Sequence, residues 1–277
     1  RGLGDVYKRQ IPRFYPRFFR VLMTFTGAIG ALCMFPLSAL ISVSVALRVH
    51  PNVLTFVGVL INILAAWALA FGRFTLAGTI MIVANIFDFI DGKVADELQL
   101  SSKFGGFWDS VMDRFSDLFL LIGLIYLYAT LNRPDYVLIT ALTLTFSIMT
   151  SYTRARAESE IQQCKVGFME RPERIVLFMI GAFTNRMAGV LWVILVLSIL
   201  TVLDRIYLTW RELQTDAKDR SATAPGFSLL PLRVVWHALF WTFDRATWQY
   251  DLMVIAILSF VWRTPPVWIG DPVASGY

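Results

Sequence analysis

The sequence predicts an all-α integral membrane protein: a bundle of six transmembrane helices, preceded by a helix at the membrane interface. Hydrophobic residues make up 57% of the 277 residues and charged residues only 16%, whereas soluble domains average about 45–50% and about 25%. The apolar residues come in long blocks, without the alternation typical of a membrane barrel. Because a bilayer offers the backbone no hydrogen-bonding partners, each block is expected to be helical.

Six apolar blocks separated by short polar turns give the expected spans. The fifth block is shorter than the others, and Pro172 marks its beginning, since proline is favoured in the first turn of a helix. The expected spans are Val53–Phe71, Thr75–Ala95, Gly105–Thr130, Asp135–Ala157, a fifth that starts with Glu173–Phe183, and Met187–Trp210. Together they define a membrane domain over residues 50–211.

The segment before this domain differs from it in character. Residues 1–10 lack an initiator methionine and match nothing downstream, so we interpret them as a non-native scar. Residues 11–49 are aromatic and basic at their start, which is typical of a membrane surface. Their second half, Leu37–Arg48, is expected to form a helix at the interface, with a further span as the alternative.

Residues 212–277 form a C-terminal extension. Gln214–Phe227 is polar and predicts a linker. Leu229–Trp268 is rich in tryptophan and phenylalanine, and its apolar run is short for a span. We interpret it as either an interfacial hairpin or an extra helix.

The basic residues, which give a net charge of +5, lie mostly between the apolar blocks. They therefore indicate lipid headgroups, not nucleic acid, as the partner. With the N-terminus in the cytoplasm, the loops on that side carry more lysine and arginine than the opposite loops, as the positive-inside rule requires. The same count places the C-terminus inside. The opposite loops carry Arg73, Arg133 and Arg186.

Four aspartates occur where the second and third spans approach each other. Asp88 and Asp91 are three residues apart near the end of one span, and Asp109 and Asp113 are four apart near the start of the next. Both spacings place a pair on one helix face. The connecting loop is short, so the helices are antiparallel neighbours and the carboxylates meet at one depth, near the cytoplasmic side.

Ionisable groups inside a membrane are costly and usually mark a site or a pathway. A lone aspartate near a helix end is usually solvated or caps the helix, but two facing pairs need a countercharge. Four carboxylates match two divalent cations, and oxygen ligands suit Mg²⁺ or Mn²⁺. Two such ions clamp phosphoryl oxygens, and the small residues Gly92, Ala95 and Gly105 let a nucleotide approach closely. Asp96 and Asp117 are interpreted as ordinary loop or helix-flank residues.

A basic cluster follows near the cytoplasmic end of the fourth span. Each member is expected in an inside loop. As a group they are expected to line a pocket for an anionic acceptor beside the aspartates, and arginine binds phosphate bidentately. This favours a phosphorylated alcohol. The cluster consists of Arg154, Arg156, Lys165, Arg171 and Arg174.

The aspartate region resembles the CDP-alcohol phosphotransferases, whose pattern is D-x2-D-G-x2-A-R-x8-G-x3-D-x3-D. The resemblance covers about Leu47–Trp210 and includes HPNVLT at His50–Thr55, while SYTRARAE and KVGFMERPER resemble members that make phosphatidylinositol-phosphate-type lipids. One position departs from the pattern, because Asp96 replaces the family arginine. The positions in register are Asp88, Asp91, Gly92, Ala95, Gly105, Asp109 and Asp113.

The resemblance implies a transferase that moves a phosphatidyl-type group from a CDP-linked lipid, such as CDP-diacylglycerol, to an alcohol and releases CMP. It implies that Asp88, Asp91, Asp109 and Asp113 hold the metals and that Asp113 also acts as general base. Asn52 and Thr55 are expected to bind the nucleotide together with the three small residues, and a homodimer is expected. Two alternatives remain open: an ion- or proton-coupled transporter, and a relative that binds CDP-lipid without turnover because of Asp96.

Overall fold

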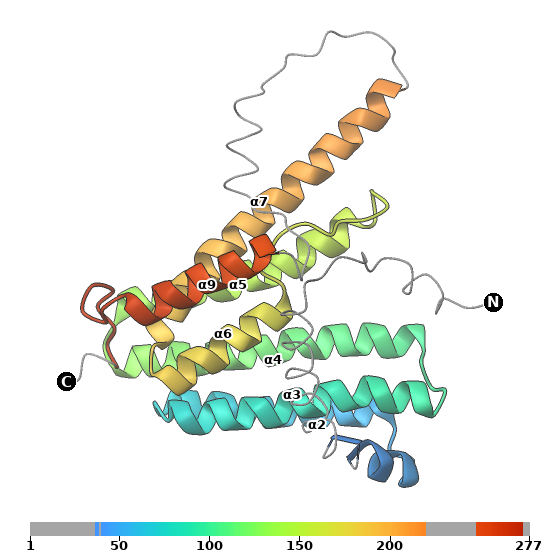
Figure 1. Cartoon of the computed structure of the whole chain (residues 1–277), viewed down its shortest axis with the longest axis horizontal. Coiled ribbons are helices and arrows are strands. Elements are labelled where there is room, and N and C mark those ends of the chain that lie inside the picture. The colour runs from blue at the N-terminus through green and yellow to red at the C-terminus, as the bar shows by residue number, and fades with distance from the viewer. Residues whose placement is uncertain (1–36, 39, 220–247, 274–277) are drawn as a thin grey trace, which may run out of the picture.

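The structure, a computed structural model, describes residues 37–38, 40–219 and 248–273, and all its regular elements there are helices. The helices α2, α3 and α4 form one side of the bundle, with α5, α6, α7 and α9 on the other (Figure 1). Residues 40–46, within the expected interfacial helix, are also helical. The bounds are α2 Pro51–Ala70, α3 Phe74–Glu97, α4 Lys103–Thr130, α5 Pro134–Ala157, α6 Arg171–Thr184, α7 Met187–Asp219 and α9 Trp248–Arg263.

Four helices of the described residues are long and apolar enough to cross a membrane: α2, α3, α5 and residues Met187–Gln214 of α7. The prediction of an all-helical, multi-pass membrane protein is therefore confirmed. The helices α4 and α6 pack among these four but differ from them. α4 has 28 residues and carries several charges in its first half, and α6 has 14 residues, about 21 Å.

Local sequence signals explain where the helices begin. Proline occupies the first turn of α2, α5 and α6, where its missing N–H costs no hydrogen bond. Ser102 caps α4 by accepting a hydrogen bond from the backbone N–H of Gly105 at 3.0 Å. The end of α6 is set by Asn185, which adopts a left-handed conformation typical of a helix C-terminus.

The helix α7 is longer than predicted. It continues past Trp210 to Asp219, so the first residues of the expected linker Gln214–Phe227 are helical. The reason is local, because the segment RELQTDAKD contains good helix formers and neither glycine nor proline. The remainder of that linker, the expected scar at 1–10 and most of residues 11–49 lie outside the described residues.

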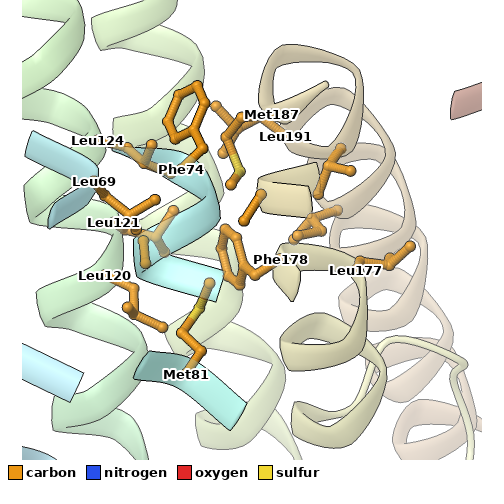
Figure 2. Packing of buried hydrophobic residues seen from close by; sticks show 14 of the residues in the cluster. Leu69, Phe74, Met81, Leu120, Leu121, Leu124, Leu177, Phe178, Met187 and Leu191 are labelled. Atoms are coloured by element: carbon orange, nitrogen blue, oxygen red, sulfur yellow. The ribbon is translucent and has the colours of Figure 1, made fainter. Parts of the chain in front are cut away.

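The larger hydrophobic cluster packs between α2, α3, α4, α6 and α7, and a smaller one of Ile41, Leu54, Ile90 and Val94 lies beside the aspartates. Figure 2 shows Leu69 of α2, Met81 of α3, Leu121 of α4 and Phe178 of α6 packed together. Helices α2 and α4 approach each other closely at Gly123, where a Cβ atom would overlap the backbone of Ala66. Small residues at such positions let membrane helices pack tightly.

The C-terminal segment ends against the turns at the core end of the bundle. Arg186, in the α6–α7 turn, donates to the carbonyl oxygens of Val261 and Thr264 at 3.3 and 2.7 Å. Arg133, in the α4–α5 turn, donates to the carbonyl of Gly270 at 2.8 Å. In the described part of the segment predicted as a hairpin or an extra helix, the structure has one helix, α9, and residues 229–247 lie outside the described residues. The expectation of a C-terminus on the aspartate side is wrong for residues 261–273, because these arginines bind them at the opposite end.

Candidate active site

Three of the four predicted aspartates form one compact group. Asp88, Asp91 and Asp109 each offer a carboxylate oxygen, and these oxygens all lie within 4.8 Å of one another. The first two come from α3 and the third from α4. Asp91 is buried, and it accepts a hydrogen bond from the Thr55 hydroxyl of α2. An all-oxygen set with this much negative charge fits a hard divalent cation.

Asp113, one turn after Asp109 on α4, is oriented toward a cation of the protein itself. Its Oδ1 lies 2.8 Å from Nη1 of Arg171, and the same nitrogen lies 2.9 Å from Oδ2 of Asp88. Arg171 therefore links Asp113 to Asp88, one of the three clustered aspartates. Among the described residues, the oxygens that come within 4.8 Å of one another do not include those of Asp113, so its predicted role as a metal ligand stays a prediction.

A pocket of about 440 Å³ opens on one side of these carboxylates. Its mostly small and polar lining comes from the starts of α2 and α4, the end of α3 and the loop between them, and it includes Asp91 and Asp109. Asp96, at the position of the family arginine, also lines it and accepts a hydrogen bond from the Ser101 hydroxyl at 3.0 Å. All five residues predicted to bind the nucleotide line this pocket: Asn52, Thr55, Gly92, Ala95 and Gly105.

A second pocket, of about 160 Å³, opens on the other side of the site. It is lined by Asp113 of α4, by the ends of α5 and of the loop that follows, and by the start of α6. Three of the five predicted acceptor residues line it, namely Arg154, Arg171 and Arg174, together with Arg205 of α7. With Arg114 of α4, five guanidinium groups line this pocket, and they favour an anionic ligand.

The other two predicted acceptor residues lie elsewhere. Arg156 pairs with Glu160 at 2.7 Å, and both side chains are largely exposed. Lys165 is exposed in the α5–α6 loop. Neither lines the second pocket. Arg154, in contrast, binds both Glu158 and Glu170, at 3.1 and 2.7 Å, so it joins the end of α5 to the segment before α6.

A buried ion pair beneath the second pocket was missed by the sequence interpretation. Nη2 of Arg174 lies 2.7 Å from Oδ2 of Asp117, and the two side chains are 3% and 7% exposed. Arg174 also donates to the hydroxyl of Thr150 at 3.2 Å. Asp117 is therefore not an ordinary flank residue. A sequence signal existed, because Asp117 is four residues after Asp113 and shares its helix face.

Arg205 was missed in a similar way, because the sequence interpretation grouped it with the basic residues that follow the last span. It is buried inside α7, and its guanidinium binds the carbonyls of Thr150 and Val166 and the carboxylate of Glu170. The signal that would have found it is its position within the span predicted over Met187–Trp210, where an ionisable residue is expected to have a role.

The loop between α5 and α6 is fastened to α7 by one further contact. The backbone N–H of Met169 donates to the hydroxyl of Thr201 at 3.1 Å. At Gly167 the loop has φ +93° and passes so close to Thr201 that a Cβ atom would overlap that side chain. Cys164 of this loop is buried, and burial raises the pKa of its thiol. The loop thus holds Arg171 at a fixed place beside the carboxylates.

Comparison with known proteins places this geometry in a family. Residues 48–203, more than half of the chain, match the family model of CDP-alcohol phosphatidyltransferases. An archaetidylinositol phosphate synthase of Pyrococcus horikoshii is 36% identical over 180 residues, which are 65% of this chain and 93% of that protein. A phosphatidylinositol phosphate synthase of Mycobacterium tuberculosis is 30% identical over 188 residues, 64% of this chain and 85% of that protein.

Solved structures agree with this assignment. The M. tuberculosis phosphatidylinositol phosphate synthase with CDP-DAG bound superposes with a TM-score of 0.59 at 25% identity, covering 63% of this chain and 93% of that one. A crystal structure of the same enzyme in complex with manganese and citrate gives a TM-score of 0.59 at 26% identity, covering 63% and 88%. The chain therefore belongs to the CDP-alcohol phosphatidyltransferase family and is a membrane transferase of phospholipid biosynthesis.

Proposed function

We propose that this enzyme transfers a phosphatidyl-type group from a CDP-linked diacylglycerol-type lipid to a phosphorylated alcohol of the inositol phosphate class, and releases CMP. The observation that carries the proposal is the pair of pockets on the two sides of one α4 turn. Asp109 lines the larger pocket and Asp113 the smaller one. A donor in one pocket and an acceptor in the other would thus meet at adjacent carboxylates.

The donor nucleotide is assigned to the larger pocket. This pocket has small residues that leave room for a nucleotide, and it adjoins the carboxylates where a diphosphate would be held. The M. tuberculosis relative, crystallised with CDP-DAG bound, supports a donor of this class.

The acceptor is assigned to the smaller pocket because of its charge. Arg114, Arg154, Arg171, Arg174 and Arg205 line a space of about 160 Å³, and a planar guanidinium matches the oxygens of a phosphate. The names of the archaeal and mycobacterial relatives, which are synthases of inositol phosphate lipids, support a phosphorylated inositol. Arg174 already binds Asp117, so we assign it to the support of the pocket and assign Arg171 and Arg154 to the ligand.

The cluster of three aspartates is assigned to the binding of divalent metal. When the site is fully occupied, it would hold two Mg²⁺ or Mn²⁺ ions. Asp88, Asp91 and Asp109 would hold them, with Asp113 at the edge. Bound metal would neutralise the diphosphate and polarise its phosphorus. The relative in complex with manganese supports this choice of ion.

The transfer step assigned to these residues is a single displacement. The acceptor hydroxyl oxygen forms a bond to the β-phosphorus of the donor, and the bond from that phosphorus to the oxygen of CMP breaks. Asp113 takes the proton of the hydroxyl, and CMP leaves with the bonding electron pair. The side chains mainly position the reactants and balance charge, which dominate the catalysis of phosphoryl transfer.

We also propose the finer topology predicted from the sequence. In this arrangement α4 and α6 span the membrane with α2, α3, α5 and α7, the residues 50–211 form the catalytic domain, and the site faces the cytoplasm. The excess of basic residues at the aspartate end supports that orientation. A homodimer is retained as part of the proposal. The transporter alternative is dropped, because the chain belongs to a family of transferases.

The test is CMP release by the purified protein in detergent with CDP-diacylglycerol, Mg²⁺ or Mn²⁺, and a panel of acceptors. The panel contains inositol 1-phosphate, inositol, glycerol 3-phosphate and serine. Release that depends on metal and is fastest with inositol 1-phosphate is expected. Faster release with an unphosphorylated acceptor would overturn the acceptor class, and no release with any of them would overturn the donor.

Asp96 requires a separate arm of this test. It lines the nucleotide pocket where the family has an arginine, and a carboxylate there repels a diphosphate. If the chain is a binding protein without turnover, metal-dependent CDP binding will occur without CMP release. Restoration of release by Asp96→Arg would then assign the loss to this one position.

A further inference from the structure

The C-terminal helix α9 lies outside the residues that match the family, 48–203. It packs beside α6 and α7 (Figure 1). Between α6 and α9 lies a groove of about 340 Å³ whose lining is apolar except for Glu173. Val176, Leu177 and Ile180 line it from α6, and Val254, Ile257 and Leu258 line it from α9.

This groove begins at the active site. Pro172, in the first turn of α6, lines both the groove and the arginine-lined acceptor pocket. The residue before it, Arg171, binds Asp88 and Asp113. From Pro172 to Ile180 the groove follows α6 for about 12 Å, close to the roughly 15 Å of hydrocarbon in one leaflet. An extended alkyl chain whose headgroup lies at the carboxylates fits this course.

The wall that α9 provides is fixed to the bundle. Val261 is 3% exposed and belongs to the core, and Ile257 packs against that core. Arg186 holds the end of the helix through the carbonyls of Val261 and Thr264. The groove is thus bounded on both sides by helices that are packed into the bundle.

We propose that this groove binds one acyl chain of the CDP-linked lipid donor, so that α9 adds a tail-binding wall to the family's catalytic domain. The inference rests on the proposed function, because it takes the donor to be a lipid whose headgroup lies at the aspartates. The consequence is that the length of the acyl chain contributes to donor affinity, through residues that lie far from the chemistry.

The test uses substitutions that obstruct the groove, one on each of the two helices that line it. Leu258→Trp and Val176→Trp place a large ring in the groove, and both positions are partly exposed, at 37% and 48%, so the core stays packed. For a long-chain CDP-diacylglycerol we expect KM to rise about tenfold, with kcat nearly unchanged. For a short-chain CDP-diacylglycerol we expect no change in either constant.

The matched control is Ile255→Trp. This residue is on the same helix, is 63% exposed and does not line the groove, so it should leave the KM of both donors unchanged. Equal effects of all three tryptophans on both donors would show a general disturbance and overturn the inference. So would groove variants with wild-type KM for the long-chain donor.

A second readout does not depend on turnover. A CDP-diacylglycerol with a diazirine at the end of one acyl chain is photolysed with the full-length protein, and the labelled peptides are mapped. Label on 254–258 or 176–180, displaced by unlabelled CDP-diacylglycerol, is expected. Label elsewhere, or equal labelling by a diazirine phosphatidylcholine, overturns the inference. Absence of CMP release by the wild type with every donor instead contradicts the proposed function, while the label still locates the chain.

Discussion

The two pockets beside the carboxylates differ in how the chain builds them. The nucleotide-side pocket is lined by residues 51–109, from α2, α3, α4 and the loop between α3 and α4. The arginine-lined pocket takes residues from positions 113 to 205, on four helices and a loop. One is a compact sequence motif that folds upon itself, and the other is assembled from distant segments. The residues of the nucleotide-side pocket can therefore be identified from the sequence, whereas those of the arginine-lined pocket can be identified only from the folded structure.

Charge distinguishes the two pockets as well. The nucleotide-side pocket carries Asp91, Asp96 and Asp109 with a single lysine, Lys93. The other pocket has five arginines and three acidic residues, and several of its arginines are already bound to those acids. The first pocket thus needs an external cation, while the second keeps an excess of positive charge after its own ion pairs are counted. The two sides are expected to respond differently to the same kind of change.

Removal of metal should have the largest effect, and it should act through the nucleotide side. With a chelator, CMP release is expected to fall to background and to return with Mn²⁺ or Mg²⁺, because no side chain replaces the lost charge on the diphosphate. Asp91→Asn should lose metal-dependent CDP binding, whereas Glu97→Gln, an exposed residue of the same helix, should keep it. Full activity in chelator would contradict the metal assignment.

Asp113→Asn should have the next largest effect, and it should separate chemistry from binding. Loss of the general base is expected to lower kcat by about 10²–10⁴-fold, while CDP still binds in the presence of metal. Steady-state kinetics and equilibrium CDP binding on the same preparation provide the measurement. A variant with wild-type kcat would remove Asp113 from the mechanism.

The buried pair beneath the arginine-lined pocket should affect stability. Asp117→Leu leaves the guanidinium of Arg174 buried without its carboxylate, and this is expected to cost about 3–5 kcal/mol of unfolding free energy. The double variant with Arg174→Met should recover much of the loss. Glu160→Gln, which removes an exposed partner of Arg156, should cost about 1 kcal/mol or less. Denaturant titration in detergent compares the three, and similar losses in all would contradict the burial argument.

Arg171→Lys should have the smallest of these effects and the most selective one. A lysine keeps the charge but cannot bridge two carboxylates and a phosphate with a planar group. We expect KM for the acceptor to rise about tenfold, with KM for the donor nearly unchanged. Arg156→Lys should change neither constant, because Arg156 does not line the pocket. A larger rise in the acceptor KM for the Arg156 variant would show that the acceptor site includes Arg156, as the sequence predicted.

The fold and the nucleotide side could be predicted because their signals are local. Apolar blocks locate the six bundle helices to within a few residues at most boundaries, and two aspartate pairs at helical spacing place carboxylates together. Asn52 and Thr55 reach the same pocket because the start of α2 lies beside the end of α3, as the hydrogen bond from Thr55 to Asp91 shows.

The arginine side could not be predicted to the same degree. Whether Arg174 faces a ligand or a buried carboxylate depends on Asp117, which is 57 residues away, and no local pattern connects them. Arg205 reaches Thr150 across 55 residues. The prediction of the length of α7 failed for a different reason. The polar composition of residues 214–219 suggested a linker, although each residue type there tolerates a helix.

The arginines of the two turns at the core end have a consequence for the order of assembly in the cell. Arg133 and Arg186 find their partners 137 and 75–78 residues further along the chain. During synthesis these turns are complete long before residues 261–273 leave the ribosome, and translation proceeds at about 5–20 residues per second. The catalytic helices therefore have several seconds to insert and pair before α9 arrives. The contacts of Arg133 and Arg186 with residues 261–273 therefore form last, and these residues take no part in the metal site.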